Sequence, residues 1–163
     1  MSFDWLSPAE RGKFLDFLFE RFGIPPSRFD GFVLYSRGDY VSALAKGAAQ
    51  AAKELEGEDG GIQVAKLTHS GFHKPATRGA QVFGDCATKN VVDLTGADLK
   101  ALVEGRRVDA PGFQGFVLLR LDGLPIGVGL CREGRLESQL PRSMTEHLVL
   151  FDAGDAVKSY NRP

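Results

Sequence analysis

Apolar and polar positions along the chain divide it into a mixed first half and a strand-rich second half. Before position 62 the pattern predicts two helices, one beginning at Pro8 and one over residues 43–55. Beyond about position 90 it predicts short strands around one helix that begins after Thr95. Helices on a small sheet are typical of an α+β fold, and many short strands around one helix indicate a small, strongly bent barrel. The sequence therefore predicts an α+β chain with a boundary near Ala87.

The first predicted helix has clear signals at both ends. Ser7 precedes Pro8 and Glu10 follows three residues after Ser7, which is the pattern of a capping box. Gly23 marks the end of this helix. Apolar residues recur between them at helical spacing: Phe14, Leu15, Leu18, Phe19 and Phe22, with Phe17 beside them. Such a stripe is typical of a helix that faces a core, and a groove that binds a partner is the alternative interpretation.

The stretch 115–129 predicts a β-hairpin. Asp122-Gly123 lies between two β-forming limbs, and this dipeptide favours the positive φ angles of a type I′ turn. Gly127 and Gly129 in the return limb are two residues apart, so they lie on one face and leave it without side chains. Two interpretations are open: room for packing at a barrel corner, or a surface that a nucleic-acid backbone approaches.

The remaining segments predict shorter elements. Strands are expected at residues 29–35, 62–67, 90–94, 106–108 and 147–151, with weak strand or coil at 136–140. Residues 40–44 fit either a return strand or a helix start, and residues 68–75 look irregular. Residues 76–87 favour a short helix that buries Ala80, Val82 or Phe83, and Ala87. Residues 155–160 favour at most two helical turns.

Composition limits the classes of function that fit. The chain has 163 residues, of which 43% are hydrophobic, and a formal net charge of -1. This charge argues against a protein dominated by non-specific attraction to nucleic acid. No apolar run approaches the ~18 residues of a membrane span and the N-terminus lacks signal-peptide features, so no membrane partner is expected. Two distant cysteines imply no disulfide framework and favour the cytoplasm.

Metal binding and nucleophilic catalysis are both disfavoured by the spacing of the reactive side chains. His69 and His73, with Cys86 and Cys131, could in principle form a tetrahedral zinc site. Gly71 between the two histidines argues against a helix that presents both to one ion. A Cys/His catalytic pair is formally possible, but no local motif selects one. We therefore expect no metal, no cofactor and no catalytic residue.

Basic residues gather in two segments of this nearly neutral chain. Residues 66–92 carry one acid against four cations, which are Lys66, Lys74, Arg78 and Lys89. A second group follows the hairpin and consists of Arg132, Arg135 and Arg142. Neighbouring cations can form a patch that contacts phosphates, whereas a solvated charged face is the alternative. His69, Phe72 and His73 interleave with the first group and could stack on unpaired bases.

Several motifs in the second half resemble a known family. They include Lys-Pro-Ala-Thr at 74–77 and Phe-Gly-Asp-Cys-Ala-Thr-Lys-Asn-Val-Val at 83–92. Others are Gly-Phe-Val-Leu at 115–118, Leu-Pro-Ile-Gly-Val-Gly at 124–129, Gly-Arg-Leu at 134–136 and Leu-Pro-Arg at 140–142. This order resembles the C-terminal RNA-binding segment of Sun-type RNA cytosine-5 methyltransferases. It is also similar to 60S subunit biogenesis proteins in which a pre-PUA α+β domain precedes a PUA pseudobarrel, including their closing stretch, here residues 148–158.

The resemblance implies a fold and a set of site residues. It implies a pre-PUA-like α+β domain over residues 1–87 packed on a PUA-like RNA-binding domain over residues 88–163. Members of these families bind RNA through basic side chains on the PUA face. Carried over to this chain, the residues implied are Lys74, Lys89, Arg132, Arg135 and Arg142. Arg78 is added from its charge alone.

The resemblance also implies a function without catalysis. Nothing in the chain resembles the nucleophile or S-adenosylmethionine motifs of the methyltransferases, and 163 residues leave no room for their catalytic domain. We expect an RNA-binding protein of rRNA maturation and ribosome biogenesis, or a targeting module for an RNA methyltransferase. Its expected partners are rRNA or a pre-ribosomal particle, and a methyltransferase or assembly factor. The alternative is a protein-protein adaptor that grips its partner through Phe14, Phe17 and Leu18.

Overall fold

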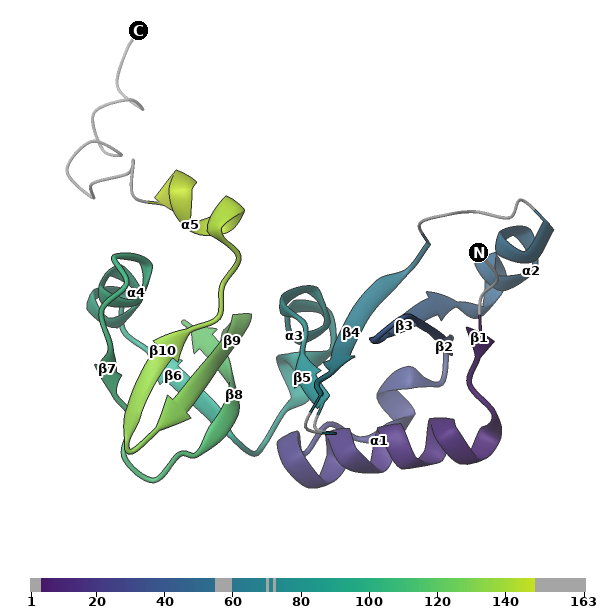
Figure 1. Cartoon of the computed structure of the whole chain (residues 1–163), viewed down its shortest axis with the longest axis horizontal. Coiled ribbons are helices and arrows are strands. Elements are labelled where there is room, and N and C mark those ends of the chain that lie inside the picture. Colours follow the sequence, from purple (N-terminus) through teal and green to yellow (C-terminus); the bar gives the residue numbers. More distant parts are fainter. Residues whose placement is uncertain (1–3, 55–59, 70, 72, 149–163) are drawn as a thin grey trace, which may run out of the picture.

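Two five-stranded sheets, each with helices packed against it, lie side by side in the computed structural model (Figure 1). The structure describes residues 4–54, 60–69, 71 and 73–148. The first half contains β1 (Asp4–Trp5), α1 (Pro8–Phe22), the 3-10 helix η1 (Pro26–Phe29), β2 (Phe32–Arg37), β3 (Tyr40–Ala45), α2 (Lys46–Glu54), β4 (Ile62–Leu67), β5 (His73–Pro75), α3 (Thr77–Phe83) and the 3-10 helix η2 (Gly84–Cys86). The second half contains β6 (Val91–Leu94), α4 (Gly96–Val103), β7 (Val108–Asp109), β8 (Gly115–Leu121), β9 (Leu124–Arg132), β10 (Arg135–Ser138) and α5 (Arg142–Leu148). The predicted α+β class is confirmed.

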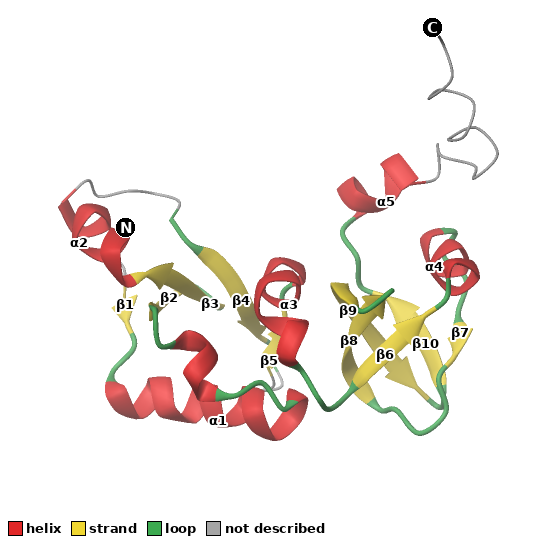
Figure 2. Ribbon diagram, turned by 180° about the vertical axis from the view of Figure 1, so that it is seen from behind, coloured by secondary structure: helices red, strands yellow, loops and turns green. Residues whose placement is uncertain are grey.

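The first sheet has the strand order β1-β2-β3-β4-β5 with antiparallel neighbours, and α1 runs along one side of it (Figure 2). The capping box of α1 is present, because Ser7 N donates to Glu10 Oε2 at 2.8 Å and Glu10 N donates back to Ser7 Oγ. Gly23 ends the helix at φ 69°. The core interpretation of its apolar stripe is confirmed for Phe14, Leu15, Leu18 and Phe22, which are buried. Phe19 departs from it and is 49% exposed.

The second sheet is a curled half-barrel with the order β6-β8-β9-β10-β7. Its one parallel pair in the described chain, β6 with β8, is connected through α4, and the other pairs are antiparallel. The predicted hairpin is confirmed, since Asp122 and Gly123 have φ angles of 50° and 80°. The core of the second sheet consists mainly of side chains from its curled strands, which include Val117, Leu119, Cys131 and Leu136.

Gly127 and Gly129 are packed against the protein's own side chains. A Cβ at Gly127 would lie 2.2 Å from Leu140 Cδ2. One at Gly129 would lie 2.5 Å from Leu136 Cδ1 and 3.0 Å from Leu119 Cδ2. The packing interpretation of these glycines is therefore correct, and this face is not open to a nucleic acid.

Four local predictions were wrong. The strand expected to begin at Phe29 begins at Phe32, because Phe29 ends η1, which follows the fixed φ angles of Pro25-Pro26. Residues 43–45 were expected to begin a helix but complete β3, so α2 begins only at Lys46. Residues 73–75 were expected to be irregular but form β5, which pairs with β4. The prediction that residues 76–87 bury Val82 or Phe83 is confirmed for Phe83, whereas Val82 is 37% exposed. Residues 147–148 belong to α5, whereas 149–151 and 155–160 lie outside the described residues.

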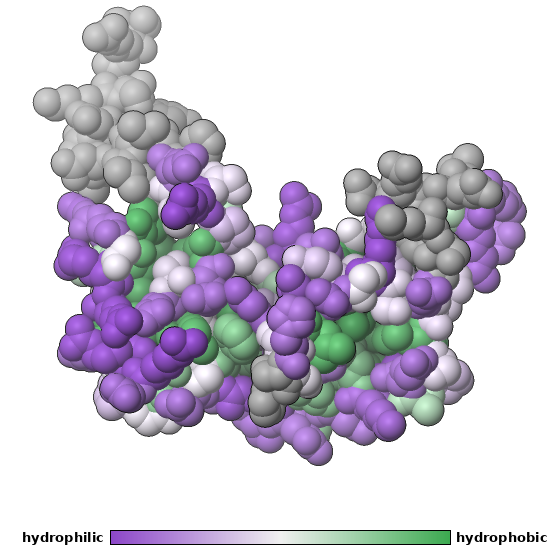
Figure 3. All heavy atoms as spheres, viewed as in Figure 1, coloured by the Kyte–Doolittle hydropathy of each residue, from purple (hydrophilic) through white to green (hydrophobic). Residues whose placement is uncertain are grey.

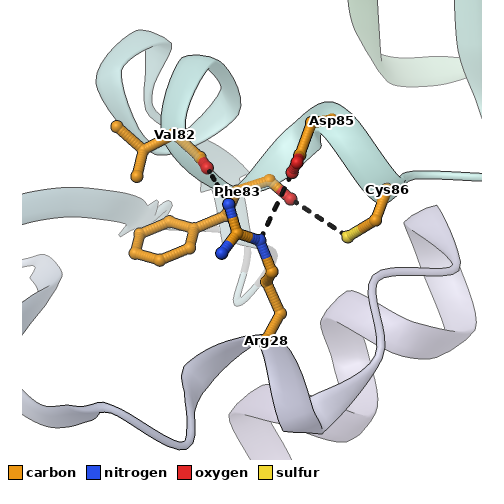
Figure 4. A network of polar contacts seen from close by, with 5 residues as sticks. All are labelled: Arg28, Val82, Phe83, Asp85 and Cys86. Carbon is orange, nitrogen blue, oxygen red and sulfur yellow. Dashed lines mark hydrogen bonds and ion pairs between the residues drawn. The ribbon is translucent and has the colours of Figure 1, made fainter.

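The segment 83–90 joins the two sheets. Thr88 N donates to Phe22 O at 2.9 Å, Asn90 Nδ2 donates to Arg21 O at 2.7 Å, and Asn90 O accepts from Leu118 N at 2.9 Å. Arg28 holds the beginning of the segment: its guanidinium donates to Val82 O at 2.9 Å and contacts Asp85 at 3.3 Å (Figure 4). One hydrophobic cluster extends across the junction, because Leu118 and Val128 pack with the residues of α1. The two halves are therefore firmly packed together.

No helix in the described part of the chain is long and apolar enough to cross a membrane.

Candidate nucleic-acid interface

A β-bulge in β4 places an unusual set of side chains on one face of the first sheet. Val41 pairs with Ala65 and Ser42 pairs with Gln63, so β4 has one extra residue at Val64. Such a bulge changes the alternation of side chains along the strand. As a result Gln63 and Lys66, which are three residues apart, both lie on the face that carries Ser42.

Four residues form a row across this face, which we call the basic row: Arg37, Tyr40, Lys66 and Lys74. Each is the direct cross-strand partner of the next. Direct partners in an antiparallel pair lie on the same face, so all four point away from the buried side chains that contact α1. Neighbouring strands are about 4.8 Å apart, and the row therefore spans about 14 Å.

Aromatic and amide groups surround the two lysines of the basic row. Lys66 Nζ lies 5.4 Å from the centroid of the Tyr40 ring, and Lys74 Nζ lies 5.8 Å from that of Phe116. Lys74 Nζ also donates to Gln139 Oε1 at 2.7 Å. Because Gln139 follows β10, this hydrogen bond connects the basic row with the second sheet.

The basic row lies in a groove made of two adjoining cavities of about 560 and 260 Å³. The cavities share Tyr40, Gln63 and Arg78, so we treat them as one basic groove. Among the described residues that line it there are four cations, the three of the basic row and Arg78 on α3, and no acid. The described lining of the groove thus carries a net positive charge, although the whole chain is nearly neutral.

Five arginines elsewhere in the described chain form ion pairs with carboxylates. Ion pairs join Arg28 to Asp85, Arg106 to Glu104, Arg107 to Glu137, Arg120 to Asp93 and Arg135 to Asp109. Lys66, Lys74 and Arg78 have no ion pair with any carboxylate that the structure describes, and neither do Arg132 and Arg142. Lys66 and Lys74 are direct cross-strand partners on the neighbouring strands β4 and β5, and like charges in that arrangement destabilise a sheet.

The six basic residues expected from the sequence lie in different places. Lys74 and Arg78 line the basic groove. Arg142 is exposed at the start of α5, immediately after Pro141, which also lines the groove. Arg135 opens β10 and pairs with Asp109 at 3.1 Å.

Arg132 and Lys89 lie near a second, mainly apolar cavity. This cavity of about 840 Å³ separates the end of α1 from β8 and β9, and its wall includes Phe17, Phe116, Leu130 and Arg132. Lys89 Nζ lies 3.5 Å from the carbonyl oxygen of Glu20, a residue that also lines the cavity. Figure 3 shows apolar side chains reaching the surface above α1 and hydrophilic ones over the second sheet.

The histidines predicted to stack on bases have different surroundings. The His73 ring packs between Phe14 and Phe17, with centroid distances of 5.2 and 5.1 Å, so it is not free as a platform for a base. Burial lowers the pKa of His73 and favours the neutral ring. His69 is exposed, and Phe72 lies outside the described residues.

The two cysteines are packed as small apolar side chains. Cys131 is fully buried in the second sheet, and Cys86 donates to Phe83 O at 3.6 Å (Figure 4). Burial raises the pKa of both thiols, and Asp85 adds to the effect on Cys86. A protonated thiol is a poor nucleophile. Within the described residues no three His, Cys, Asp or Glu side chains gather where they could hold a metal ion.

Comparison with known proteins identifies the second half of the chain. Residues 89–145 match the family model described as Methyltransferase RsmF PUA domain. The chain therefore contains a PUA domain, as its motifs predicted. A crystal structure of a PUA domain from Aeropyrum pernix K1, in a tartrate complex, has a TM-score of 0.46 and 17% identity and covers 90% of this chain and 77% of its own.

Two curated relatives are rRNA methyltransferases. "Ribosomal RNA small subunit methyltransferase F" of Psychromonas ingrahamii (strain DSM 17664 / CCUG 51855 / 37) is 29% identical over 126 residues, which are 73% of this chain. The protein of the same name from Aeromonas salmonicida (strain A449) is 27% identical over 132 residues, or 80% of this chain. In both cases the chain spans about a quarter of the relative's length, 26%.

The sequence analysis did not single out Tyr40, and it counted Lys66 only as a charge. The available signal was the imperfect alternation of residues 62–67, which the bulge at Val64 explains. Without the strand register, nothing indicated that Lys66 and Lys74 are direct neighbours.

Proposed function

We propose that this protein is a non-catalytic RNA-binding protein that acts in rRNA maturation, or that targets an rRNA methyltransferase to its substrate. The observation that carries the proposal is the match of residues 89–145 to the PUA domain of methyltransferase RsmF. The names of the two relatives support rRNA as the RNA concerned. We further propose a functional division between Ala87 and Thr88, with cytoplasmic action alongside a methyltransferase or assembly factor.

The proposed RNA contacts are the six cations named from the sequence: Lys74, Arg78, Lys89, Arg132, Arg135 and Arg142. The position of Lys74 and Arg78 in the basic groove supports their inclusion. Arg132 is exposed at the end of β9, where a phosphate could reach it. Arg135 has to exchange its Asp109 partner for a phosphate, which costs little because both side chains are more than half exposed.

The adaptor alternative named Phe14, Phe17 and Leu18, and two of these three side chains are buried. Phe14 and Leu18 are 4% and 3% exposed, so a partner cannot grip α1 through them. An enzyme built on Cys86 or Cys131 is disfavoured because burial keeps both thiols protonated. The methyltransferase activity in the relatives' names belongs to proteins about four times as long as the matched region.

Two measurements test the proposal. RNA crosslinked to the protein in cells should, on sequencing, be enriched in rRNA, and a random sample of cellular RNA would contradict the proposal. In vitro, Arg132→Ala with Arg135→Ala should weaken binding of a labelled single-stranded RNA. The slope of log affinity against log salt concentration should become less steep by about 1.4, since each lost phosphate contact contributes about 0.7. Lys13→Ala with Lys100→Ala, exposed on α1 and α4, is the matched control and should bind as the wild type does.

A further inference from the structure

We propose that the basic groove on the first sheet is a binding site for single-stranded RNA, in which Tyr40 stacks on a base while Lys66, Lys74 and Arg78 contact phosphates. This inference rests on the proposed RNA-binding function. It places part of the RNA on the first sheet, outside the matched PUA segment.

The charges of the groove point to an anionic ligand. Lys66 and Lys74 are direct neighbours on β4 and β5, both are half-buried, and neither has a carboxylate partner in the described residues. Their repulsion is a cost that a bound phosphate would remove. Arg78 approaches from α3 on the same cavity wall and supplies a planar donor suited to a phosphate.

The architecture of the site favours RNA over an acidic peptide. Extended peptides commonly bind by adding a strand to a free sheet edge. The groove instead lies mainly over β3 and β4, which are hydrogen-bonded on both sides, and reaches the edge strand β5 only at Lys74 and Pro75. A ligand over β3 and β4 meets the side chains of these strands, and aromatic rings among cations on a sheet surface suit unpaired bases.

A single strand fits the groove better than a duplex. Tyr40 lies in the concave surface between the sheet, α3 and the segment after β10, so a base must leave a helical stack to reach it. The hydrogen bond from Lys74 to Gln139 lies where the groove on the first sheet meets the segment that follows β10 of the second sheet. RNA in the groove would thus continue toward Pro141 and Arg142, where it meets the site proposed above.

The test uses a fluorescein-labelled oligouridine of about 12 nucleotides, a length within the range of single-strand sites, and measures anisotropy at several salt concentrations. Lys66→Gln with Lys74→Gln should weaken binding about tenfold or more and reduce the salt slope by about 1.4. Tyr40→Leu should weaken binding by about 5- to 160-fold, the range that corresponds to the loss of one stacked base. Tyr40→Phe keeps the ring and should bind like the wild type, as should the control Lys13→Gln with Lys100→Gln. Melting temperatures show whether each variant is folded.

A crosslinking experiment on the wild type does not depend on the stability of any variant. Oligouridine containing 4-thiouridine should, on irradiation, attach to the peptide that carries Tyr40. Attachment confined to the second sheet, or full binding by the Lys66/Lys74 variant, overturns the inference while leaving the proposed function intact. Equal competition by a duplex of the same length, or by polyglutamate, also overturns it. Wild-type protein that binds no RNA at low salt refutes the proposed function itself.

Discussion

Gly79 on α3 sets how closely this helix lies against β4, and its replacement by Ala tests that contact. A Cβ at Gly79 would lie 2.7 Å from both the Cα and the carbonyl oxygen of Val64, and 2.9 Å from Gln63 O. All three are backbone atoms, so no side-chain rotation relieves the overlap. Gly79→Ala must therefore push α3 away from β4.

The size of the effect follows from two opposing contributions. Ala is favoured over Gly within a helix by about 0.5–1 kcal/mol, whereas overpacking costs about 1–3 kcal/mol and occasionally more. Because the overlap is with backbone, we expect the upper end of that range and a net loss of about 2 kcal/mol. For a chain of this size such a loss lowers the melting temperature by about 4–8 °C.

Gly12 on α1 is the matched control, because a Cβ there meets no atom within 4 Å. Gly12→Ala should raise the melting temperature by about 1–4 °C, from the helix propensity of Ala and the lower entropy of the unfolded chain. Thermal denaturation followed by circular dichroism measures both variants. A Gly79→Ala variant as stable as the wild type would refute the close contact of α3 with β4. Destabilisation by both variants to the same extent would show that the contact is not the cause.

Three further predictions concern the second sheet, the junction and His73. Gly129→Val should lower the melting temperature more than Gly127→Val. A Cβ at Gly129 meets two buried leucines of the core, whereas a Cβ at Gly127 meets chiefly the end of the Leu140 side chain, which can rotate away. Arg21→Met removes the hydrogen bond to Phe116 O at 2.8 Å, and its free energy of unfolding in urea should fall by about 1–3 kcal/mol. Burial lowers the pKa of His73, and its Nδ1 has no hydrogen-bond partner among the described residues. The contribution of the neutral ring to stability is therefore complete above about pH 6.5 and is lost as the pH falls toward the folded-state pKa. When the pH is lowered from 7.5 to 5.5, the melting temperature of the His73→Phe variant should therefore fall by less than that of the wild type.

Much of the fold could be predicted because its signals are local. The capping boxes at Ser7 and Thr95 and the turn at Asp122-Gly123 each depend on a few consecutive residues, and the structure contains all three. The short strands were harder, since β5 is defined by its pairing with β4 rather than by its own pattern. The α5 helix was missed because His147 and Leu148 continue an apolar run that equally suits a strand.

The candidate site could be predicted only in part, because it depends on strand register. Lys74 and Arg78 were found as charges in a basic segment. Tyr40 lies 26 positions before the start of that segment at Lys66, and only the antiparallel pairing of β3, β4 and β5 brings it next to Lys66 and Lys74. The bulge at Val64 decides the face of Lys66, and a one-residue change in register would turn its side chain toward α1.

Of the motifs that carried the family resemblance, residues 74–77 and Pro141 line the basic groove, whereas residues 83–92 do not. The position of the 83–92 motif outside the groove has a physical reason. Residues 83–90 are engaged in holding α1 to the second sheet: Asn90 bridges Arg21 and Leu118, and a Cβ at Gly84 would lie 3.3 Å from Leu118. Groups committed to such contacts are not available to a ligand. Lys66 and Lys74 show the opposite condition, with charges that the described fold leaves uncompensated. The junction motif therefore fixes how the two sheets face each other, and in the proposed mode of binding that fixed arrangement would allow one RNA strand to contact the groove and the PUA domain together.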